Sequence, residues 1–280
     1  MKCLCRLGNA AWGFRRMPLE KQLAATAAMG LSLLELSLGD DESARVPTAA
    51  DDVAIDQVRS LFHAHAVDLA CGSIGNDFTH EDAARNRQEL ERVKHLIDCA
   101  SRLGLGAIRI FAGFSPAEAV TGRRWDCMVQ CLNMAAEHAR VRQVTLAIET
   151  HGGVNPAGEG VVHFHSVSTR PDLLARLLQD LDPGLMFNFD PANLWAAGIT
   201  RPHTVREILG ERVSYVHLKD FRPLASGGLV PVGCGEGALN WDEVMGSLTG
   251  YRGPAFIEYE VPEDVIDGCR RSLRFLERYV

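Results

Sequence analysis

Short apolar runs alternate with longer amphipathic stretches along the whole chain. The short runs are rich in β-branched and aromatic residues, as buried strands are, whereas apolar residues in the intervening stretches recur at helical spacing. Strands are predicted by this pattern at residues 2–7, 31–37, 66–70, 106–114, 144–151, 184–190, 213–220 and 254–260. Helices are predicted between them, at residues 18–30, 52–65, 79–104, 125–140, 170–181, 203–210, 241–249 and 263–279.

Capping and turn residues place the ends of several predicted elements. Thr79 with Asp82 is predicted to cap the start of the long third helix, and Gly104 to close it. The stretches 152–168 and 221–240 are rich in glycine and follow predicted strands, so they are predicted to be loops.

The regular alternation of strand and helix predicts an α/β protein with a (β/α)₈ TIM-barrel fold. Near-continuously apolar strands are typical of parallel strands that are covered on both faces, and eight such units fit a chain of 280 residues. A doubly wound open sheet is the competing fold. That fold usually carries a glycine fingerprint after its first strand, which this sequence lacks. Because no linker composition interrupts the pattern, residues 1–280 are predicted to form a single domain.

Composition narrows the classes of partner and location. The net charge of −7 argues against a nucleic-acid partner, since phosphates favour a basic face. The 8 cysteines form no C-x-x-C pair and are interpreted as reduced thiols. The first residues contain no apolar signal region, and no apolar run approaches the roughly 20 residues of a membrane span. A cytoplasmic protein with no membrane partner is therefore predicted.

Four ionisable residues stand at the carboxyl ends of late strands: Glu149, Asp190, His217 and Glu258. Alternation along each strand points all four to the barrel axis, at the face where the active sites of such barrels lie. Three carboxylates this close cannot all stay ionised without a cation. Three carboxylates and one imidazole suit one divalent metal ion, with Mn²⁺ or Mg²⁺ first and Co²⁺ or Zn²⁺ as alternatives.

The motifs around these residues resemble the sugar phosphate isomerase/epimerase family, the xylose-isomerase-like TIM barrels. They are Ile-Glu-Thr-His at 148–151, Asn-Phe-Asp-Pro-Ala-Asn at 188–193, Val-His-Leu-Lys-Asp at 216–220, Gly-Glu-Gly at 235–237 and Phe-Ile-Glu at 256–258. The resemblance implies a metal held by Glu149, Asp190, His217 and Glu258. It also implies that the two glutamates are the catalytic acid/base groups. Relatives often form dimers or tetramers, so a homo-oligomer is an open alternative.

The predicted reaction is isomerisation or epimerisation of a keto-sugar or a related small polyhydroxy ketone. A metal on the ketone and its neighbouring hydroxyl makes the α-proton more acidic and stabilises the enediolate. Return of the proton to either carbon gives an epimer or an isomer, whereas loss of a β-hydroxyl gives dehydration. The alternative is therefore a metal-dependent dehydratase on the same scaffold, acting on dehydroshikimate or a keto-sugar.

Three further residues are predicted to contact the substrate: His151, Asn193 and Lys219. His151 is equally well interpreted as a hydrogen-bonded residue behind the ligands, and Lys219 as the partner of a carboxylate. Many family members carry a histidine at the position of Asn193, and an amide cannot shuttle a proton at neutral pH. This departure favours a dehydratase or an unusual keto-sugar substrate over a simple ketose 3-epimerase.

Two other classes share the scaffold. A DNA-repair endonuclease of the same superfamily would need additional metal ligands and a basic groove, and the net charge of −7 disfavours it. A non-catalytic sugar-binding protein would bind sugar without exchanging its α-proton.

Overall fold

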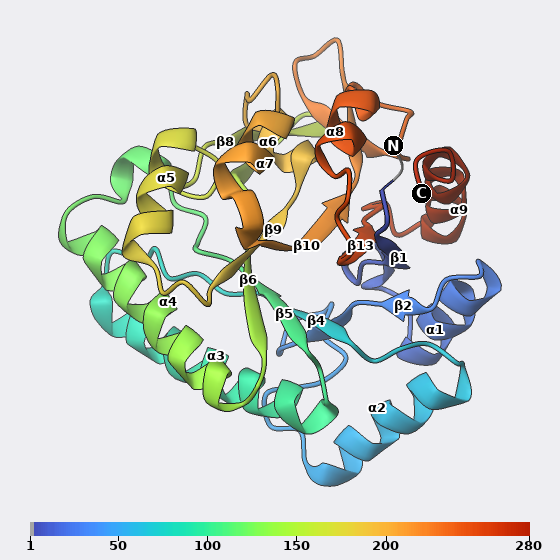
Figure 1. Ribbon diagram of the computed structural model, residues 1–280, viewed down its shortest axis with the longest axis horizontal. Helices are drawn as coiled ribbons and strands as arrows, with labels where there is room; N and C mark the ends of the chain where they lie inside the picture. Colours follow the sequence, from blue (N-terminus) through green and yellow to red (C-terminus); the bar gives the residue numbers. More distant parts are fainter. Residues whose placement is uncertain (1–2) are drawn as a thin grey trace.

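The computed structural model describes residues 3–280 and contains a parallel barrel surrounded by helices (Figure 1). Its sheet has the order β2-β1-β13-β10-β9-β6-β5-β4-β3, and all of its pairs are parallel. The strands are β1 (Arg6–Asn9), β2 (Leu33–Leu34), β3 (Leu36–Leu38), β4 (Cys71–Ile74), β5 (Ala107–Ile110), β6 (Thr145–Glu149), β9 (Met186–Phe189), β10 (Val213–Leu218) and β13 (Pro254–Ile257).

The two ends of this sheet belong to one segment of chain. Strand β2 pairs with β1, strand β3 pairs with β4, and only Glu35 separates β2 from β3. The predicted strand at 31–37 therefore closes the sheet on itself and confirms the (β/α)₈ barrel.

Helices cover the outside of the barrel, and the two chain ends lie near each other (Figure 1). They are α1 (Leu19–Ala28), α2 (Asp52–Ala64), α3 (Ala83–Leu103), α4 (Arg123–Val141), α5 (Pro171–Asp180), α6 (Pro191–Ala196), α7 (His203–Leu209), α8 (Trp241–Ser247) and α9 (Val265–Leu276). Short 3₁₀ turns lie at Trp12–Phe14, Ala117–Ala119 and Gly210–Arg212. No helix within residues 3–280 has the length and apolar character needed to cross a membrane.

Several predicted boundaries differ from the observed ones. The first strand, predicted at 2–7, is observed at Arg6–Asn9, and residue 2 lies outside the described residues. The strand predicted at 66–70 is instead β4 at 71–74, because Ala66 takes a left-handed turn with φ of 53° after α2. Gly72 made this stretch look like a loop. The neighbouring strand leaves no room for a side chain at this position, since a Cβ on Gly72 would lie 2.9 Å from the backbone carbonyl oxygen of Leu36.

The cap predicted for the third helix also differs. Asp82, not Thr79, is the N-cap residue of α3, and its side chain accepts a hydrogen bond from the Ala84 amide. The Thr79 hydroxyl donates to Asp77 instead. Gly104, with φ of 82°, ends the helix as predicted.

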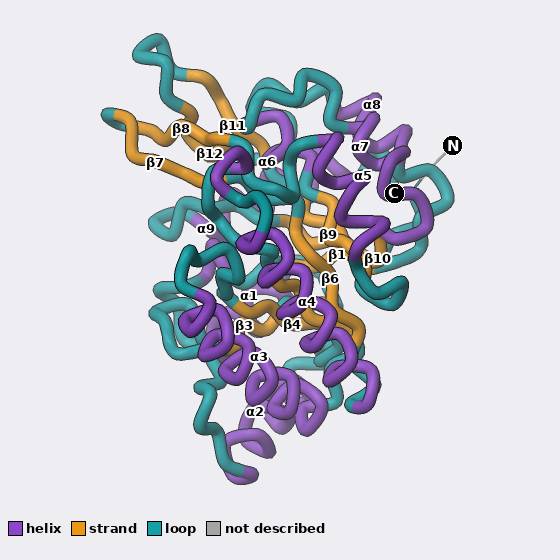
Figure 2. The backbone as a smooth tube through the Cα atoms, turned by 90° about the vertical axis from the view of Figure 1, so that its left-hand side faces the viewer, coloured by secondary structure: helices purple, strands orange, loops and turns teal. Residues whose placement is uncertain are grey.

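The two glycine-rich stretches predicted as loops contain a second sheet. It consists of β7 (Gly153–Ala157), β8 (Gly160–Phe164), β11 (Asp220–Pro223) and β12 (Leu229–Val232), in the order β11-β12-β8-β7. This antiparallel sheet projects beyond the barrel (Figure 2). Each stretch folds back through a short turn, so glycines that mark the turns hide the strand pattern beside them.

The core is divided by the barrel wall, as strand alternation predicts. On β10, Val216 and Leu218 pack with the helices in the large outer core, whereas Tyr215 packs in a small axial cluster. Phe256 stacks on Tyr215 within this cluster, with ring centroids 4.9 Å apart. The axial cluster closes the barrel below His217 and leaves the carboxyl ends of the strands for polar side chains.

Asp220 organises the glycine-rich segment that follows β12. Its buried carboxylate accepts hydrogen bonds from the backbone amides of Gly235, Gly237 and Leu239, and from the Trp241 indole. These backbone amides therefore already donate to Asp220, so they are not free to bind the oxygens of a phosphate group, as the amides of a glycine-rich phosphate-binding loop do.

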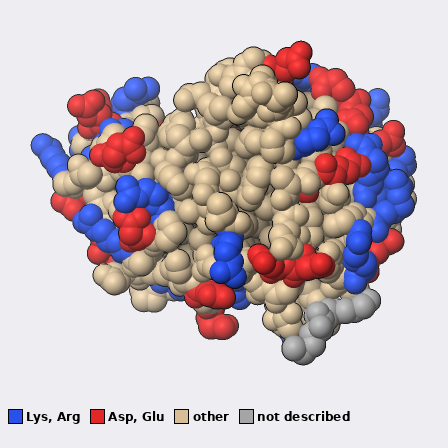
Figure 3. Space-filling model, turned by 90° about the horizontal axis from the view of Figure 1, so that it is seen from above, with Lys and Arg blue, Asp and Glu red and all other residues tan. Residues whose placement is uncertain are grey.

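Charged side chains are unevenly spread over the face of the molecule seen from above (Figure 3). Basic and acidic groups of the described residues are interspersed along its two sides, and the middle carries few of them. The observed mixture of signs on this face differs from the continuous basic surface that phosphate backbones favour.

Candidate active site

A cavity of about 530 Å³ opens at the carboxyl ends of the barrel strands. Its wall combines both sheets, because Val154, Val161, His163 and Pro231 of the antiparallel sheet cover one side. The remaining lining residues come from the barrel strands and the loops that follow them: Trp12, Arg15, Ser37, Asp41, Ser43, Ser73, Gly75, Arg109, Phe111, Phe114, Glu149, His151, Lys219, Glu258 and Glu260.

The four residues predicted to hold a metal come together at the base of this cavity. Each of Glu149, Asp190, His217 and Glu258 is buried, and one ligand atom from each lies within 4.8 Å of the others. Glu149 and His217 lie in β6 and β10, whereas Asp190 and Glu258 directly follow β9 and β13. Neighbouring parallel strands thus bring together residues that are far apart in the sequence, up to the 109 positions that separate Glu149 from Glu258.

Asp190 is held by the helix that it starts. Its Oδ1 accepts hydrogen bonds from the amides of Ala192 and Asn193, each 2.9 Å long, and so caps α6. The Asn193 side-chain amide then donates to Glu149 Oε1 at 2.8 Å and to Asp190 Oδ2 at 3.0 Å. Asn193 is fully buried, and it orients two of the four ligand candidates.

Glu35, which the sequence reasoning did not select, fixes the orientation of His217. His217 Nε2 lies 3.1 Å from Glu35 Oε1, so the ring turns Nδ1 toward Glu149 and Glu258, at 3.7 and 3.5 Å. Glu35 is itself held by the Tyr215 hydroxyl and the Ala11 amide. The available signal was a carboxylate inside the apolar run Leu-Ser-Leu-Leu-Glu-Leu-Ser at 31–37.

We expect Glu35→Gln to weaken binding of Mn²⁺ by about 10- to 100-fold, because an outer carboxylate fixes the tautomer of a ligand histidine. A titration of Mn²⁺ against a competing chelator measures this change. Glu20→Gln, on the exposed surface of α1, serves as the control and should bind the ion as the unmodified protein does. An unchanged dissociation constant in Glu35→Gln would exclude this role.

Two buried cations face the carboxylates. Arg109 Nε lies 3.0 Å from Glu149 Oε2 and forms a buried ion pair with it. Lys219 Nζ lies 2.6 Å from Glu258, 2.8 Å from Glu260 and 3.2 Å from Asp190. Together with Glu35, the cluster has more buried carboxylates than permanent cations, so it retains an excess of negative charge.

The protonation of the cluster reflects this excess. Burial alone would raise the pKa of Glu149, but Arg109 and His217 outweigh burial and lower it to about 2. Burial raises the pKa of Asp190 to about 7, although Lys219 opposes the change. Burial would lower the pKa of His217, yet Glu258, Glu35 and Glu149 raise it well above its ordinary value. Without a further cation, protons would therefore partly neutralise the cluster.

The donor set fits a divalent metal ion. His217 Nδ1 is buried and has no hydrogen-bond partner within residues 3–280, although it faces the carboxylates of Glu149 and Glu258, and such an atom is costly unless a ligand pairs with it. Three carboxylates with one imidazole match the ligands of Mn²⁺ and Mg²⁺, and also allow Co²⁺ or Zn²⁺.

The structure separates the three predicted substrate contacts. His151 and Lys219 line the cavity, whereas Asn193 lies behind the ligand candidates. His151 donates through Nδ1 to the Gly152 carbonyl, and its ring meets the edges of Phe111 and Phe114. The aromatic pair and His151 thus form one wall of the cavity.

His163 of β8 is a second histidine of this wall, and burial lowers its pKa to about 3. In the folded protein His163 stays neutral down to about pH 3, whereas in the unfolded chain it takes up a proton below its ordinary pKa of about 6.5. Its contribution to stability is therefore present above pH 6.5 and is lost as the pH falls toward 3. The free energy of unfolding should decrease between pH 7 and pH 5 in both proteins. We expect this decrease to be about 1–2 kcal/mol smaller in His163→Gln than in the unmodified protein. Urea unfolding at both pH values measures this difference, and an unchanged pH dependence would contradict it.

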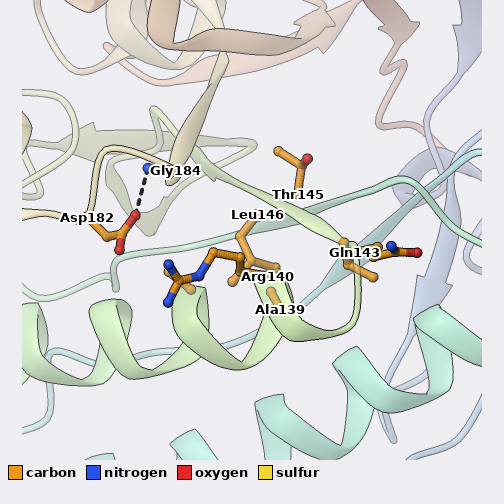
Figure 4. A pocket seen from close by; sticks show the side chains of 9 residues that line it. Ala139, Arg140, Gln143, Thr145, Leu146, Asp182 and Gly184 are labelled. Carbon is orange, nitrogen blue, oxygen red and sulfur yellow. Dashed lines mark hydrogen bonds between the residues drawn. The ribbon is translucent and has the colours of Figure 1, made fainter.

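A smaller cavity of about 280 Å³ lies at the opposite, amino end of β6 (Figure 4). It is lined by residues at the end of α4, including Arg140 and Gln143, and by Asp182 and Gly184 before β9. The Asp182 carboxylate accepts a hydrogen bond from the Gly184 amide. This end of a barrel contributes to stability and does not carry the active site.

Comparison with known proteins places this architecture in a family. The family model for the xylose isomerase-like TIM barrel matches residues 23–279. This chain belongs to the xylose isomerase-like TIM barrel family. None of the curated proteins matches the sequence significantly.

Three solved structures illustrate how widely this fold is shared. D-allulose 3-epimerase from Methylomonas sp. superposes with a TM-score of 0.77 at 16% identity, covering 100% of this chain and 99% of that one. The probable 3-DHS dehydratase AsbF from Bacillus anthracis gives 0.76 at 16% identity and 98% coverage of both chains. A xylose isomerase domain protein from Planctomyces limnophilus gives 0.71 at 20% identity, covering 92% and 90%. At these identities the similarity establishes the fold.

Proposed function

We propose that this xylose isomerase-like barrel is a divalent-metal-dependent isomerase or epimerase of a keto-sugar or related small polyhydroxy ketone. One observation carries the proposal: three carboxylates and one imidazole converge within 4.8 Å at the base of a cavity at the carboxyl ends of the strands. Fold relatives include sugar 3-epimerases, and a Mycobacterium smegmatis relative was solved in complex with magnesium. We further propose that residues 1–280 form a single domain.

The position of each ligand candidate supports a division of labour. Glu149 and Glu258 line the cavity, whereas Asp190 and His217 are held behind them by α6 and Glu35. A bound divalent ion would polarise a ketone and its neighbouring hydroxyl, and so stabilise the negative charge that forms when the α-proton leaves. In our proposal Glu149 or Glu258 removes that proton as an ionised carboxylate, and either the carboxyl group formed in this way or a protonated group on the opposite face returns one.

The cations keep these two glutamates ready to act as bases. Arg109 beside Glu149 and Lys219 beside Glu258 favour the ionised carboxylates, and the pKa of each glutamate lies below its ordinary value although burial would raise it. A carboxylate that is ionised can accept the α-proton. Lys219 also lines the cavity, so it would contact the substrate oxygens in addition to Glu258.

A metal-dependent dehydratase is the second candidate. His151 lines the cavity, where a protonated imidazole would give its proton to a departing β-hydroxyl group; burial lowers the pKa of His151, and the charge of Glu149 opposes this change. The fold relatives include a probable 3-DHS dehydratase as well as epimerases. A dehydratase would release an unsaturated product, whereas an epimerase would exchange the α-proton without loss of water.

Metal content and proton exchange together test the proposal. The protein is incubated with Mn²⁺, desalted and analysed for metal beside Asp190→Asn and the control Asp172→Asn, whose carboxylate is exposed on α5. We expect about one equivalent of metal in the unmodified protein and the control, and loss of metal in Asp190→Asn with the fold retained. Exchange of ketose α-protons in heavy water then tests the reaction. A folded protein that stays metal-free after incubation would exclude both reactions.

A further inference from the structure

Arg15 lines the same cavity as the metal candidates Glu149 and Glu258. It follows β1 in the 3₁₀ turn region at Trp12–Phe14, and it lines the cavity together with Trp12. Its guanidinium lies over the Trp12 ring, with Cζ 4.5 Å from the ring centroid. Its side chain is only 14% exposed, so the charge is partly removed from solvent.

One edge of this guanidinium is fixed and the other is free. Nη1 donates to the carbonyl oxygens of Trp12 and Glu260, at 2.9 and 3.1 Å. Within residues 3–280, no hydrogen bond uses Nε or Nη2, and neither atom is buried. The Nε–Nη2 edge is the pair of parallel donors that binds a carboxylate or phosphate through two hydrogen bonds.

The surrounding backbone holds Arg15 in this position. The guanidinium of Arg45 donates to the carbonyl groups of Phe14, Arg15 and Met17. Gly13 packs directly on the chain after β13, since a Cβ there would lie 1.9 Å from the Tyr259 carbonyl oxygen. A side chain that is fixed before binding loses less conformational entropy when a ligand arrives.

Arg15 also differs from the other cations of the cavity in its charge balance. Arg109 and Lys219 each contact a buried carboxylate within 3.0 Å. For Arg15, the carboxylate within 4.0 Å among the described residues is that of Glu42, whose Oε1 lies 4.0 Å from Nε and whose side chain is 72% exposed, and the Glu260 carboxylate that also acts on Arg15 is shared with Lys219. An exposed pair at this distance contributes little, so the positive charge of Arg15 is available to a ligand.

Groups that can bind substrate hydroxyls line the same cavity as Arg15. Ser37 and Ser43 share a hydrogen bond of 3.1 Å, and Ser43 donates to Asp41 Oδ1. All three residues line the cavity. Asp41 would accept a hydrogen bond from a substrate hydroxyl, and it directly precedes Glu42, whose carboxylate lies 4.0 Å from Arg15 Nε.

We propose that the substrate carries a terminal anionic group, a carboxylate or a phosphate, which Arg15 binds through its Nε–Nη2 edge while the ketone lies at the metal candidates. This inference rests on the proposed function, and it narrows the substrate to a polyhydroxy keto acid or a ketose phosphate. The span is short: Arg15 donates to Glu260, two residues beyond Glu258, which corresponds to about 7 Å of extended chain.

Calorimetric binding of matched probes tests the anion site without requiring turnover. D-gluconate, D-glucitol 6-phosphate and D-glucitol are titrated into the Mn²⁺-incubated protein and into Arg15→Gln, Arg15→Lys and Arg16→Gln. We expect at least one anionic probe to bind about ten-fold or more tightly than D-glucitol, which is the strength expected of a charge-assisted bidentate contact. Arg15→Gln should remove this preference and Arg15→Lys should retain part of it. Arg16→Gln, whose exposed side chain pairs with Glu263, should leave it unchanged.

The results distinguish a carboxylate from a phosphate ester as the bound group, and they distinguish an anion site from a purely structural role of Arg15. Tighter binding of gluconate identifies a carboxylate, and tighter binding of the phosphate identifies a phosphate ester. Equal binding of all three probes, no binding of any, or a preference that survives in Arg15→Gln would overturn the proposal. A uniform weakening for all probes in Arg15→Gln, with a lower melting temperature, would assign Arg15 only to joining two loops.

Proton exchange distinguishes this failure from failure of the proposed function. D-fructose, D-fructose 6-phosphate and 5-dehydro-D-gluconate are incubated with the protein in heavy water. An anion preference in calorimetry without exchange of any ketone would retain the Arg15 site and reject the isomerase. Equal exchange of D-fructose by the unmodified protein and Arg15→Gln, without anion preference, would retain the isomerase and reject the Arg15 site.

Discussion

Exchange of the substrate α-proton is expected to fall by about 10²- to 10⁴-fold in Glu258→Gln, the contribution typical of a positioned acid/base group. The amide of glutamine cannot accept a proton at neutral pH, and it weakens the ion pair with Lys219, now 2.6 Å long. NMR of a ketose in heavy water measures the exchange, and metal content is determined on the same sample.

Glu263→Gln is the matched control, because Glu263 lies five residues further along the chain and its exposed side chain pairs only with Arg16 among the described residues. Its exchange rate should equal that of the unmodified protein. If folded Glu258→Gln exchanged the proton at a rate within a few-fold of normal, Glu258 would be neither the base nor an essential ligand.

Replacing Lys219 by methionine should lower the free energy of unfolding of the metal-free protein by about 3–5 kcal/mol. The side chain of Lys219 is 1% exposed and contacts three carboxylates, those of Glu258, Glu260 and Asp190. Methionine has a similar length, so packing is largely retained, whereas the carboxylates lose their shared cation and remain buried. Urea unfolding in the presence of EDTA measures the difference.

A second lysine provides the comparison for Lys219. Lys94 pairs with the largely exposed Glu91 on the surface of α3, so Lys94→Met should change stability by less than about 1 kcal/mol. A loss below about 1 kcal/mol in Lys219→Met would mean that protons already neutralise the carboxylates in the metal-free protein. Burial raises the pKa of Asp190 to about 7, which makes Asp190 the first of them to accept a proton.

Local sequence patterns were sufficient for the barrel and for its four metal candidates. Most barrel strands are short apolar runs, and their alternation determines which side chains face the axis. The position of Glu149, Asp190, His217 and Glu258 at strand ends then follows, because parallel strands of a barrel end at one face. These inferences use only the order of residues within each strand and the geometry common to all such barrels.

Elements with weak local patterns were missed. The antiparallel sheet of β7, β8, β11 and β12 joins two glycine-rich segments that are far apart in sequence, and its strands pair only in the folded protein. Strand β4 contains Gly72, whose lack of a side chain is required by the neighbouring strand β3 and not by local preference. Strand pairing of this kind depends on tertiary contacts more than on propensity.

Periodicity within single strands is enough to predict the fold and the residues that meet at the base of the cavity. The charge and orientation of those residues depend on contacts that form only in the folded protein. Glu35 reaches His217 across 182 positions, Lys219 lies among three carboxylates, and Arg15 keeps one edge free because carbonyl groups from two separate loops hold the other. Hydrogen bonds and charge compensation of this kind depend on distances between side chains from different strands, which no local pattern encodes.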